Sequence, residues 1–390
     1  MISVEAALDH LFALVAPLPA ETVALADAAG RVLAEDAVAR RDQPPFAASA
    51  MDGYAVAGAG VRPGATFRVI GEAAAGNGFG GAVGAGQAVR IFTGAPLPEG
   101  TDRVVIQEDV DRAGDTVTLG DGPGDSDHVR PAGADFRVGD RLRAPRVLTP
   151  ADIALLAAMN LPEIRVTRRP EVALISTGDE LVMPGEAPGP DQIIASNTFG
   201  LKAMLESIGA RARILPIARD NTASLETAFS LAGGADIVVT IGGASVGDHD
   251  LVGRVAEGLG VARSFYKVAM RPGKPLMAGR MGDAAMVGLP GNPVSAMVCG
   301  HVFLAPMVRA LQGLGAEPAP RRTARLSRDL PQGGPREHYM RAEVANGLIT
   351  PEPRQDSALL SVLANANALM IRPAGDGARS QGDEMEYLAL

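Results

Sequence analysis

The sequence predicts an α/β domain flanked by β-rich regions, and three observations support this prediction. Between about 171 and 312, short apolar runs alternate with segments whose apolar residues recur at helical spacing. This is the pattern of a parallel sheet with crossover helices. Between about 40 and 145, short apolar runs alternate with Gly and Pro turns, which is typical of a small β-rich domain. From about 321 onward the helix signals fade and short strand-like runs remain, which predicts a small β-barrel.

The composition argues against several classes of protein. The chain has 390 residues and a net charge of -9, which argues against sequence-independent nucleic-acid binding. Its N-terminus lacks the basic segment of a signal peptide, and we find no run of about 18 apolar residues that would span a membrane. We therefore expect a cytoplasmic protein. The single cysteine, Cys299, cannot form a disulfide or zinc cluster within the chain and is interpreted as a small buried residue in a helix.

The first helix and the β-rich region follow from local signals. Ser3 is expected to cap a helix that ends before Pro17, with one apolar face formed by Val4, Ala7, Leu8, Leu11 and Val15. Strands are expected over 103–110 and 116–119. The glycine-rich segment 71–86 lacks the Gly-Lys-Ser/Thr ending of a Walker loop, so we interpret it as a surface loop.

The later elements follow in order. Strands are expected over 172–175, 211–217 and 236–241, and a helix over 222–231. Ser196 or Asn197 is expected to cap another helix, which Gly209 ends. A last helix is expected to begin at Asn292-Pro293, because Pro is favoured at the first helical position. Three strands are expected near the C-terminus, over 339–344, 368–372 and 384–388.

Three loops rich in glycine and hydroxyl groups follow the predicted strands, over 176–180, 242–248 and 289–295. Ligands of parallel α/β sheets bind beyond the carboxyl ends of the strands, and N–H groups at helix N-termini favour phosphates and oxyanions. One such loop is ordinarily only a tight turn, but three in one domain favour an anionic ligand. The candidate binding residues are Ser176, Thr177, Gly242, Gly243, Ser245, Pro290, Asn292, Pro293 and Ser295.

Charged residues gather near the same loops. Lys267, Arg271 and Lys274 lie within eight positions, and the alternative to an anion site is a solvated basic face. Acidic residues are placed near the same strand ends: Asp179, Glu180, Asp220, Asp248 and Asp250. Acids that face a polyanionic ligand make sense with a bridging metal, most naturally Mg²⁺. His249, between two of these acids, is interpreted as a surface residue.

The β-rich region offers a second group of polar candidates. Asp52 lies in a tight turn among small residues, although Asp-Gly is ordinarily only a turn signal. Two further loops, over 91–100 and 130–135, present a hydroxyl, a guanidinium and a carboxylate, which belong to Thr93, Arg130 and Asp135.

Taken together, six motifs resemble the molybdopterin molybdenumtransferase family, which includes bacterial molybdenum-insertion enzymes and the E domain of gephyrin. The motifs occupy 49–55, 92–100, 176–181, 242–247, 271–275 and 289–295. Their order and spacing match over essentially the whole chain. The resemblance implies an elongated homodimer whose active cleft lies between the α/β domain of one subunit and the β-rich domain of the other.

The resemblance also implies four domains. A discontinuous linking domain comprises 1–40 and 141–168, and it brackets a β-rich domain over 41–140. An α/β domain similar to the molybdopterin-adenylylating proteins covers 169–318, and a C-terminal β-barrel covers 319–390. Matched motif by motif, the family's important residues are Asp52, Thr93, Arg130, Asp135, Glu180, Asp220, Asp250, Lys267, Arg271, Pro290 and Pro293.

The activity implied by this resemblance is molybdenum insertion: adenylylated molybdopterin and the substrate molybdate give molybdenum cofactor and AMP. Glu180, Asp220 and Asp250 are the expected Mg²⁺ ligands, and Arg271, Lys267 and Ser295 the expected molybdate contacts. Position 271 is Arg where some relatives have Lys, which changes the donor geometry. A dimeric scaffold of the gephyrin type and a molybdopterin adenylyltransferase remain alternatives. A molybdopterin-adenylylating protein is an expected partner, and neither nucleic acid nor a membrane is.

Overall fold

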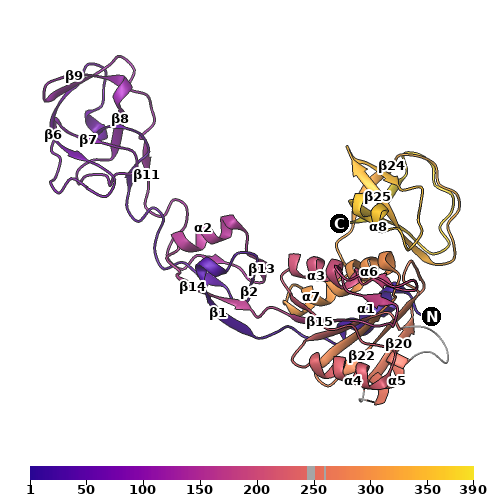
Figure 1. Ribbon diagram of the computed structural model, residues 1–390. Helices are drawn as coiled ribbons and strands as arrows, with labels where there is room; N and C mark the ends of the chain where they lie inside the picture. The colour runs from indigo at the N-terminus through magenta and orange to yellow at the C-terminus, as the bar shows by residue number, and fades with distance from the viewer. Residues whose placement is uncertain (244–250, 259–260) are drawn as a thin grey trace.

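The computed structural model describes residues 1–243, 251–258 and 261–390. Figure 1 shows an elongated chain, with a β-rich region at one end and an α/β domain at the other. A small linking region lies between them, and a C-terminal β-barrel packs on the α/β domain. The predicted combination of one α/β domain with β-rich regions and a C-terminal barrel is therefore confirmed.

The linking region is built from segments on both sides of the β-rich insertion. Its four-stranded sheet has the order β1-β14-β2-β13, with bounds Ala20–Ala24, Glu163–Thr167, Val32–Leu33 and Arg146–Val147. Helix α2 (Pro150–Ala158) begins with a capping box between Thr149 and Asp152, which satisfies free N–H groups of its first turn. The strand pair β3 (Ala37–Val38) and β12 (Arg141–Leu142) leads out to the insertion.

The β-rich region contains a six-stranded sheet of order β8-β5-β7-β6-β10-β9. The bounds are Arg103–Ile106, Gly53–Val56, Gln87–Ile91, Thr66–Ala73, Thr116–Leu119 and Val110–Ala113. A 3-10 turn over Gln107–Asp109 divides the strand expected over 103–110. Another 3-10 turn covers Gly58–Gly60, and a short ribbon joins β4 (Ala48–Ser49) to β11 (Val129–Arg130).

The α/β domain has a six-stranded sheet of order β18-β15-β19-β23-β22-β20. The bounds are Arg211–Ile214, Glu171–Ser176, Ile237–Ile241, Ala284–Leu289, Pro275–Met281 and Ala262–Lys267. The first four strands are parallel to one another as expected. Strand β22 runs in the opposite direction and pairs antiparallel with both β23 and β20. The expected parallel sheet is therefore present in these four strands, and β22 and β20 extend it through antiparallel pairings that were not expected. A tight turn that contains Gly282 at φ +57° joins β22 directly to β23, so no crossover helix intervenes.

Helices cover both faces of this sheet. Helices α1 (Val4–Phe12), α3 (Asn197–Ser207), α6 (Pro293–Cys299) and α7 (Ala305–Leu311) lie on one face (Figure 1). Helices α4 (Thr222–Leu231) and α5 (Leu251–Gly258) lie on the other. Ser3 caps α1 through its hydroxyl as expected, but the helix ends at Phe12 and excludes Val15. Neither Ser196 nor Asn197 caps α3 through its side chain. The Asn197 amide instead donates to the carbonyl of Gly291 at 2.7 Å.

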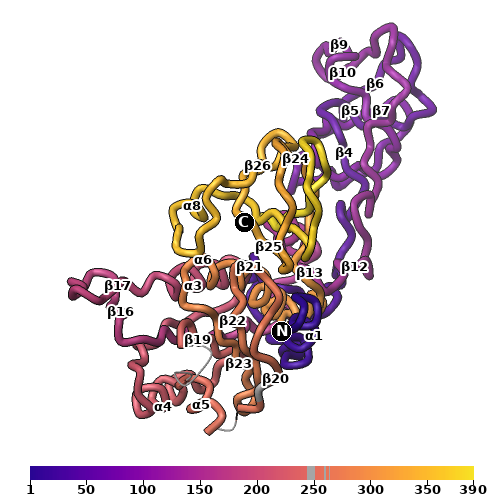
Figure 2. The backbone as a smooth tube through the Cα atoms, turned by 90° about the vertical axis from the view of Figure 1, so that its right-hand side faces the viewer, coloured from indigo at the N-terminus to yellow at the C-terminus, as the bar shows by residue number. Residues whose placement is uncertain are grey.

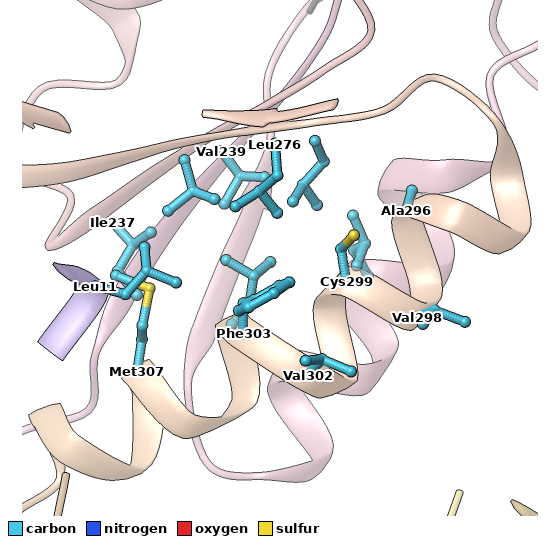
Figure 3. Close-up of a cluster of buried hydrophobic side chains, with 14 of the residues drawn as sticks. Leu11, Ile237, Val239, Leu276, Ala296, Val298, Cys299, Val302, Phe303 and Met307 are labelled. Atoms are coloured by element: carbon cyan, nitrogen blue, oxygen red, sulfur yellow. The ribbon is translucent and has the colours of Figure 1, made fainter. Parts of the chain in front are cut away.

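The central core helix is continuous from Pro293 to Leu311. It consists of α6 (Pro293–Cys299), a π-helical turn (Gly300–Leu304) and α7 (Ala305–Leu311). Figure 3 shows its side chains, Phe303 and Met307 among them, packed against the sheet. The helix is long and apolar enough to cross a membrane, but 78% of its most apolar window is buried inside the protein. Such burial is typical of a core helix. Cys299 is fully buried in it, as predicted.

The C-terminal region closes into a five-stranded barrel, because β25 pairs with β27 as well as with β26. The strands are β24 (Arg322–Leu326), β25 (Glu337–Ala345), β26 (Leu348–Pro351), β27 (Ala368–Arg372) and β28 (Glu384–Ala389), and α8 covers Leu360–Asn365. The short strand β21 (Met270–Arg271) of the α/β domain pairs with β25. Figure 2 shows β16 (Leu181–Val182) and β17 (Ile193–Ile194) projecting from the α/β sheet as a separate arm.

Candidate functional site

A cavity of about 600 Å³ opens beyond the carboxyl ends of β15, β19 and β23. All three glycine-rich loops reach it, as the position of the loops after parallel strands requires. The predicted binding residues that line it are Ser176, Thr177, Glu180, Gly242, Gly243, Pro290, Asn292 and Pro293. The arm formed by β16 and β17 supplies Leu181, Ile193 and Ile194 to the same wall. The cavity therefore combines N–H and hydroxyl donors with one carboxylate and an apolar side.

The backbone of the first loop directs Glu180 toward this cavity. Gly178 has φ +141°, and a Cβ at this position would lie 2.2 Å from a Glu180 carboxylate oxygen. Only glycine leaves room there for the carboxylate. Arg219 fastens the loop, because its Nη1 donates to the carbonyls of Asp179 at 3.1 Å and Leu181 at 3.0 Å. The N–H of Asp220 donates to Asp179 at 3.2 Å, which ties the two acidic loops together.

The second and third loops approach the first closely. Gly242 has φ +96°, and a Cβ there would lie 2.7 Å from the carbonyl oxygen of Thr177, so glycine is required. The following candidates Ser245 and Asp250 lie outside the described residues, as do Asp248 and His249. On the third loop, Asn292 and Pro293 begin α6 at the cavity, whereas Ser295 is buried within that helix and does not line the cavity wall.

The three basic candidates lie along residues 267–274 and do not line the cavity wall. Lys267 ends β20, Arg271 lies on β21, and Lys274 immediately precedes the wall residue Pro275. Arg271 and Lys274 are exposed. In the pairing of β21 with β25, Arg271 lies opposite His338 of the barrel. The basic segment therefore lies where the α/β domain meets the barrel.

Arg341 of the barrel adds a buried positive charge at this junction. Its side chain is fully buried, and its Nε and Nη1 atoms have no hydrogen-bond partner within the described part of the chain. Its Nη2 donates to the carbonyl of Asp356 at 2.9 Å. Burial and the charge of Arg271 lower the pKa of Arg341, so two guanidinium groups repel each other here. An anion placed between them would relieve that repulsion.

His338 lies within the same positive potential. Its Nε2 is buried and has no partner among the residues described. Burial, followed by the charges of Arg271, Arg341, Arg372 and Arg336, lowers the pKa of His338 to about 4. The ring is therefore neutral at pH 7, because burial and the neighbouring guanidinium charges both disfavour its charged form. We name Arg271, Arg341 and His338 the basic junction.

A single segment of the barrel connects the basic junction to the cavity. The carbonyl of Asp356 accepts from Arg341, and the carbonyl of Ser357 accepts from the N–H of Val294 on α6 at 3.0 Å. The next residue, Ala358, lines the cavity. The buried guanidinium of Arg341, with two donor atoms that have no partner in the described structure, thus lies behind the cavity wall.

Asp52 of the β-rich region is paired with Thr93, and we name these two residues the Asp52–Thr93 pair. The Asp52 carboxylate accepts from both the N–H and the hydroxyl of Thr93, each at 2.8 Å. The Thr93 N–H and then its hydroxyl hold the pKa of Asp52 below its usual range. Arg130 and Asp135 line a second cavity of about 590 Å³, together with Gly94, the residue after Thr93. The structure therefore places these four candidates close together on the β-rich region.

The two groups of candidates lie at opposite ends of the elongated chain (Figure 1). Asp52, Thr93, Arg130 and Asp135 are not brought to the large cavity within one chain. Among the residues that the structure describes, no three His, Cys, Asp or Glu side chains cluster as a metal site. Glu180 lines the cavity and Asp220 does not, and the third expected ligand, Asp250, lies outside the described residues.

Sequence reasoning missed Arg341, His338 and Arg219, which holds the first loop through hydrogen bonds to its carbonyls. Period-two alternation along 339–344 puts Arg341 on the same strand face as Tyr339, which is 2% exposed. A charged residue on a buried face was a signal that could have identified it. His338 could not be identified from the sequence, because the approach of Arg271 to it depends on tertiary pairing.

The chain matches three family profiles in order: MoeA N-terminal region (domain I and II) over residues 2–160, probable molybdopterin binding domain over 173–310, and MoeA C-terminal region (domain IV) over 323–390. The molybdopterin molybdenumtransferase of Haemophilus influenzae is 40% identical over 76% of this chain and 74% of the relative. That of Nostoc is 36% identical over 95% of this chain and 88% of the relative. A molybdopterin biosynthesis MoeA protein from Pyrococcus horikoshii superposes with a TM-score of 0.84 at 29% identity, covering 100% of this chain and 99% of that one. The chain therefore belongs to the molybdopterin molybdenumtransferase family.

Proposed function

We propose that this protein inserts molybdenum into molybdopterin, converting adenylylated molybdopterin and molybdate into molybdenum cofactor and AMP. The observation that carries the proposal is the large cavity of about 600 Å³, where three donor-rich loops meet beside the basic junction with its partly unpaired Arg341. Family membership supports the same activity, because the matched relatives are named molybdopterin molybdenumtransferase. We expect it to act in the cytoplasm, without nucleic acid or a membrane as partner.

The adenylylated pterin fits the cavity by its chemistry. Backbone N–H groups of the loops around Gly242 and Asn292 suit phosphate oxygens. The hydroxyls of Ser176 and Thr177 add polar contacts, and the apolar side chains of Ile193 and Ile194 offer a surface for a planar ring. The dithiolene sulfurs belong to the substrate, so the reaction requires no protein thiol. In agreement with this, the only cysteine is buried and its pKa is raised by burial.

Molybdate, a tetrahedral dianion, is expected at the basic junction. Arg271 is exposed and would donate charge-assisted hydrogen bonds to it. The buried Arg341 contributes through its charge, since its unpartnered atoms have no contact with solvent. Lys267, Lys274 and Ser295 remain proposed contacts from the sequence. Binding the oxyanion close to the cavity would place it beside the dithiolene in a reactive orientation.

Mg²⁺ is part of the proposal, and the side chains present are compatible with it. Mg²⁺ is held in proteins by one or two carboxylates plus substrate phosphates. Glu180 supplies one carboxylate at the cavity, and the link from Asp220 to Asp179 holds a second acidic loop beside it. Asp250 is the third proposed ligand. When bound, Mg²⁺ would neutralise phosphate charge, while the loop N–H groups and hydroxyls orient the adenylyl linkage.

A homodimer is proposed because the β-rich region, which carries the Asp52–Thr93 pair, lies far from the cavity of its own chain (Figure 1). In a two-fold dimer, the same contact forms twice, so each cavity would receive Asp52, Thr93, Arg130 and Asp135 from the other subunit. Asp52 would then orient water or the pterin. The four-domain division into 1–40 with 141–168, 41–140, 169–318 and 319–390 belongs to this proposal, as does a molybdopterin-adenylylating protein as the source of substrate.

The experiment is incubation of the purified protein with adenylylated molybdopterin, while AMP is measured with and without molybdate and Mg²⁺. AMP release that requires both supports the proposal. Equal release without any oxyanion would indicate a simple hydrolase and reject insertion. Formation of adenylylated molybdopterin from ATP and molybdopterin would instead identify an adenylyltransferase.

A further inference from the structure

Arg90 contacts residues next to both members of the Asp52–Thr93 pair in the β-rich region. It lies on β7 directly opposite Tyr54 of β5, in antiparallel register. Phe92 follows two residues later and therefore points to the same face of the sheet. The Arg90 guanidinium carbon lies 5.1 Å from the centre of the Tyr54 ring and 4.8 Å from that of Phe92, within the range of cation–π attraction.

Its hydrogen bonds hold the backbone at Asp52 and Gly53. Arg90 Nη1 donates to the carbonyl of Gly53 at 3.2 Å, and Nη2 donates to Oε1 of Gln107 at 2.6 Å. The N–H of Gln107 in turn donates to the carbonyl of Asp52 at 3.1 Å. The guanidinium thus binds the residue after Asp52 directly and Asp52 itself through Gln107.

The same guanidinium constrains the partner of Asp52. Phe92, on which it stacks, immediately precedes Thr93, whose N–H and hydroxyl both donate to the Asp52 carboxylate. Gly53 lies close to the neighbouring strand, because a Cβ at this position would lie 2.0 Å from the carbonyl oxygen of Val105. Tyr54 is 4% exposed within an apolar cluster, so one wall of the stack is fixed by the core.

We propose that Arg90 is a positioning residue that holds Asp52 and Thr93 in the one arrangement in which the carboxylate accepts both hydrogen bonds. It acts through its planar fork, which reaches two acceptors while its face contacts two rings. Its positive charge also contributes to lowering the pKa of Asp52, after the two Thr93 donors. The consequence for turnover rests on the proposed molybdenum insertion, whereas the consequence for local structure does not.

The test compares three variants of the full-length protein. Arg90→Met keeps an apolar stem against Tyr54 but removes the fork and the charge. Arg90→Lys keeps the charge but cannot bond Gly53 and Gln107 in the same geometry. Arg112→Met is the matched control: it removes an exposed arginine from β9, three strands away in the same sheet.

Residue-resolved hydrogen exchange provides the readout that needs no substrate. In Arg90→Met, the amides of Thr93 and Gln107 should exchange at least about tenfold faster. The amides of Val89 and Val105 in the strands, and all four in Arg112→Met, should be unchanged. Unchanged exchange at Thr93 and Gln107 would overturn the inference, and equal acceleration at all four amides would do so too, by showing a general loss of strand structure.

Turnover gives the second readout. Arg90→Met should lower kcat roughly tenfold to a hundredfold with KM nearly constant, and Arg90→Lys should recover part of the loss. Equal kcat in Arg90→Met and Arg112→Met would remove Arg90 from the site. If the wild-type protein shows no molybdate-dependent turnover but Arg90→Met still loosens Thr93, the proposed function fails and the positioning role is supported.

Discussion

Replacing Arg341 with methionine should separate stability from molybdate binding. The substitution removes one good hydrogen bond, from Nη2 to the Asp356 carbonyl at 2.9 Å, with a net contribution of about 1.5–3 kcal/mol. It also removes two buried donors that have no partner in the described structure, each of which costs about 1–3 kcal/mol. Methionine fills a similar volume. The barrel should therefore lie between about 1 kcal/mol less stable and about 4 kcal/mol more stable, with a net gain expected.

The matched control is Arg372→Met on β27. Arg372 is also buried, but its Nε donates to Asp376 at 2.9 Å, and its Nη1 and Nη2 donate to the carbonyls of Pro331 at 2.7 Å and Gly377 at 2.6 Å. Its loss leaves the buried Asp376 with Arg379 as its remaining ion-pair partner in the part of the chain described. The expected destabilisation is about 3–5 kcal/mol. The two variants thus delete the same group from adjacent strands with opposite effects.

Stability is measured region by region, through hydrogen exchange of the β25 and β27 amides, because a chain of several domains has no single unfolding free energy. Molybdate dependence of AMP release is measured on the same samples. Arg341→Met should raise the half-saturating molybdate concentration about tenfold or more, because it removes a positive charge near the anion. Tenfold corresponds to about 1.4 kcal/mol of binding free energy. A barrel weakened as strongly as in Arg372→Met would refute the absence of hydrogen-bond partners at Arg341, and an unchanged molybdate dependence would refute its role in anion binding.

Three further results are expected. Arg271→Ala should raise the half-saturating molybdate concentration about tenfold with little change in melting temperature, because it removes an exposed charge-assisted contact; an unchanged dependence would place the anion elsewhere. Asp52→Ala and Glu180→Ala homodimers should both be nearly inactive, whereas co-expression of the two should restore roughly a quarter of wild-type activity, since about half of the dimers would be mixed and each would keep one intact site; purified heterodimers without activity would contradict the shared cleft. Burial would raise the pKa of Asp376, but hydrogen bonds from Arg379 and Arg372 outweigh it and hold that pKa below its usual range. The stability contributed by the ionised carboxylate is therefore fully present above about pH 4 and is lost as the pH falls through the lowered value. The stability difference between wild type and Asp376→Asn should shrink in that range, and a constant difference down to pH 2 would argue against it.

Local signals sufficed for much of the fold. The helix expected over 222–231 has those bounds because Asn221 caps it, accepting from the N–H of Ser224 at 2.9 Å. The strand over 368–372 also matches β27. The antiparallel edge of the α/β sheet was missed, because apolar runs such as those of β22 and β23 do not reveal strand direction. Their connection through Gly282 was the available hairpin signal.

The site was only partly accessible from the sequence. Loops that follow parallel strands meet at one edge of the sheet, so the residues around Thr177, Gly242 and Asn292 could be assembled from order alone. Arg341 and Arg271 are far apart in the chain, and their approach depends on β21 joining the barrel. The separation of Asp52 from the cavity follows from the length of the linking region (Figure 1), which no local pattern encodes.

The central claim is that oxyanion insertion and loss of the adenylyl group are one coupled reaction at this cavity. The most direct measurement is the ratio of molybdenum bound in the pterin product to AMP released, in a single-turnover reaction with adenylylated molybdopterin, Mg²⁺ and increasing molybdate. Coupling predicts one molybdenum per AMP at every molybdate concentration, and almost no AMP when molybdate is omitted. AMP released in excess of incorporated molybdenum, at a rate independent of molybdate, would contradict it.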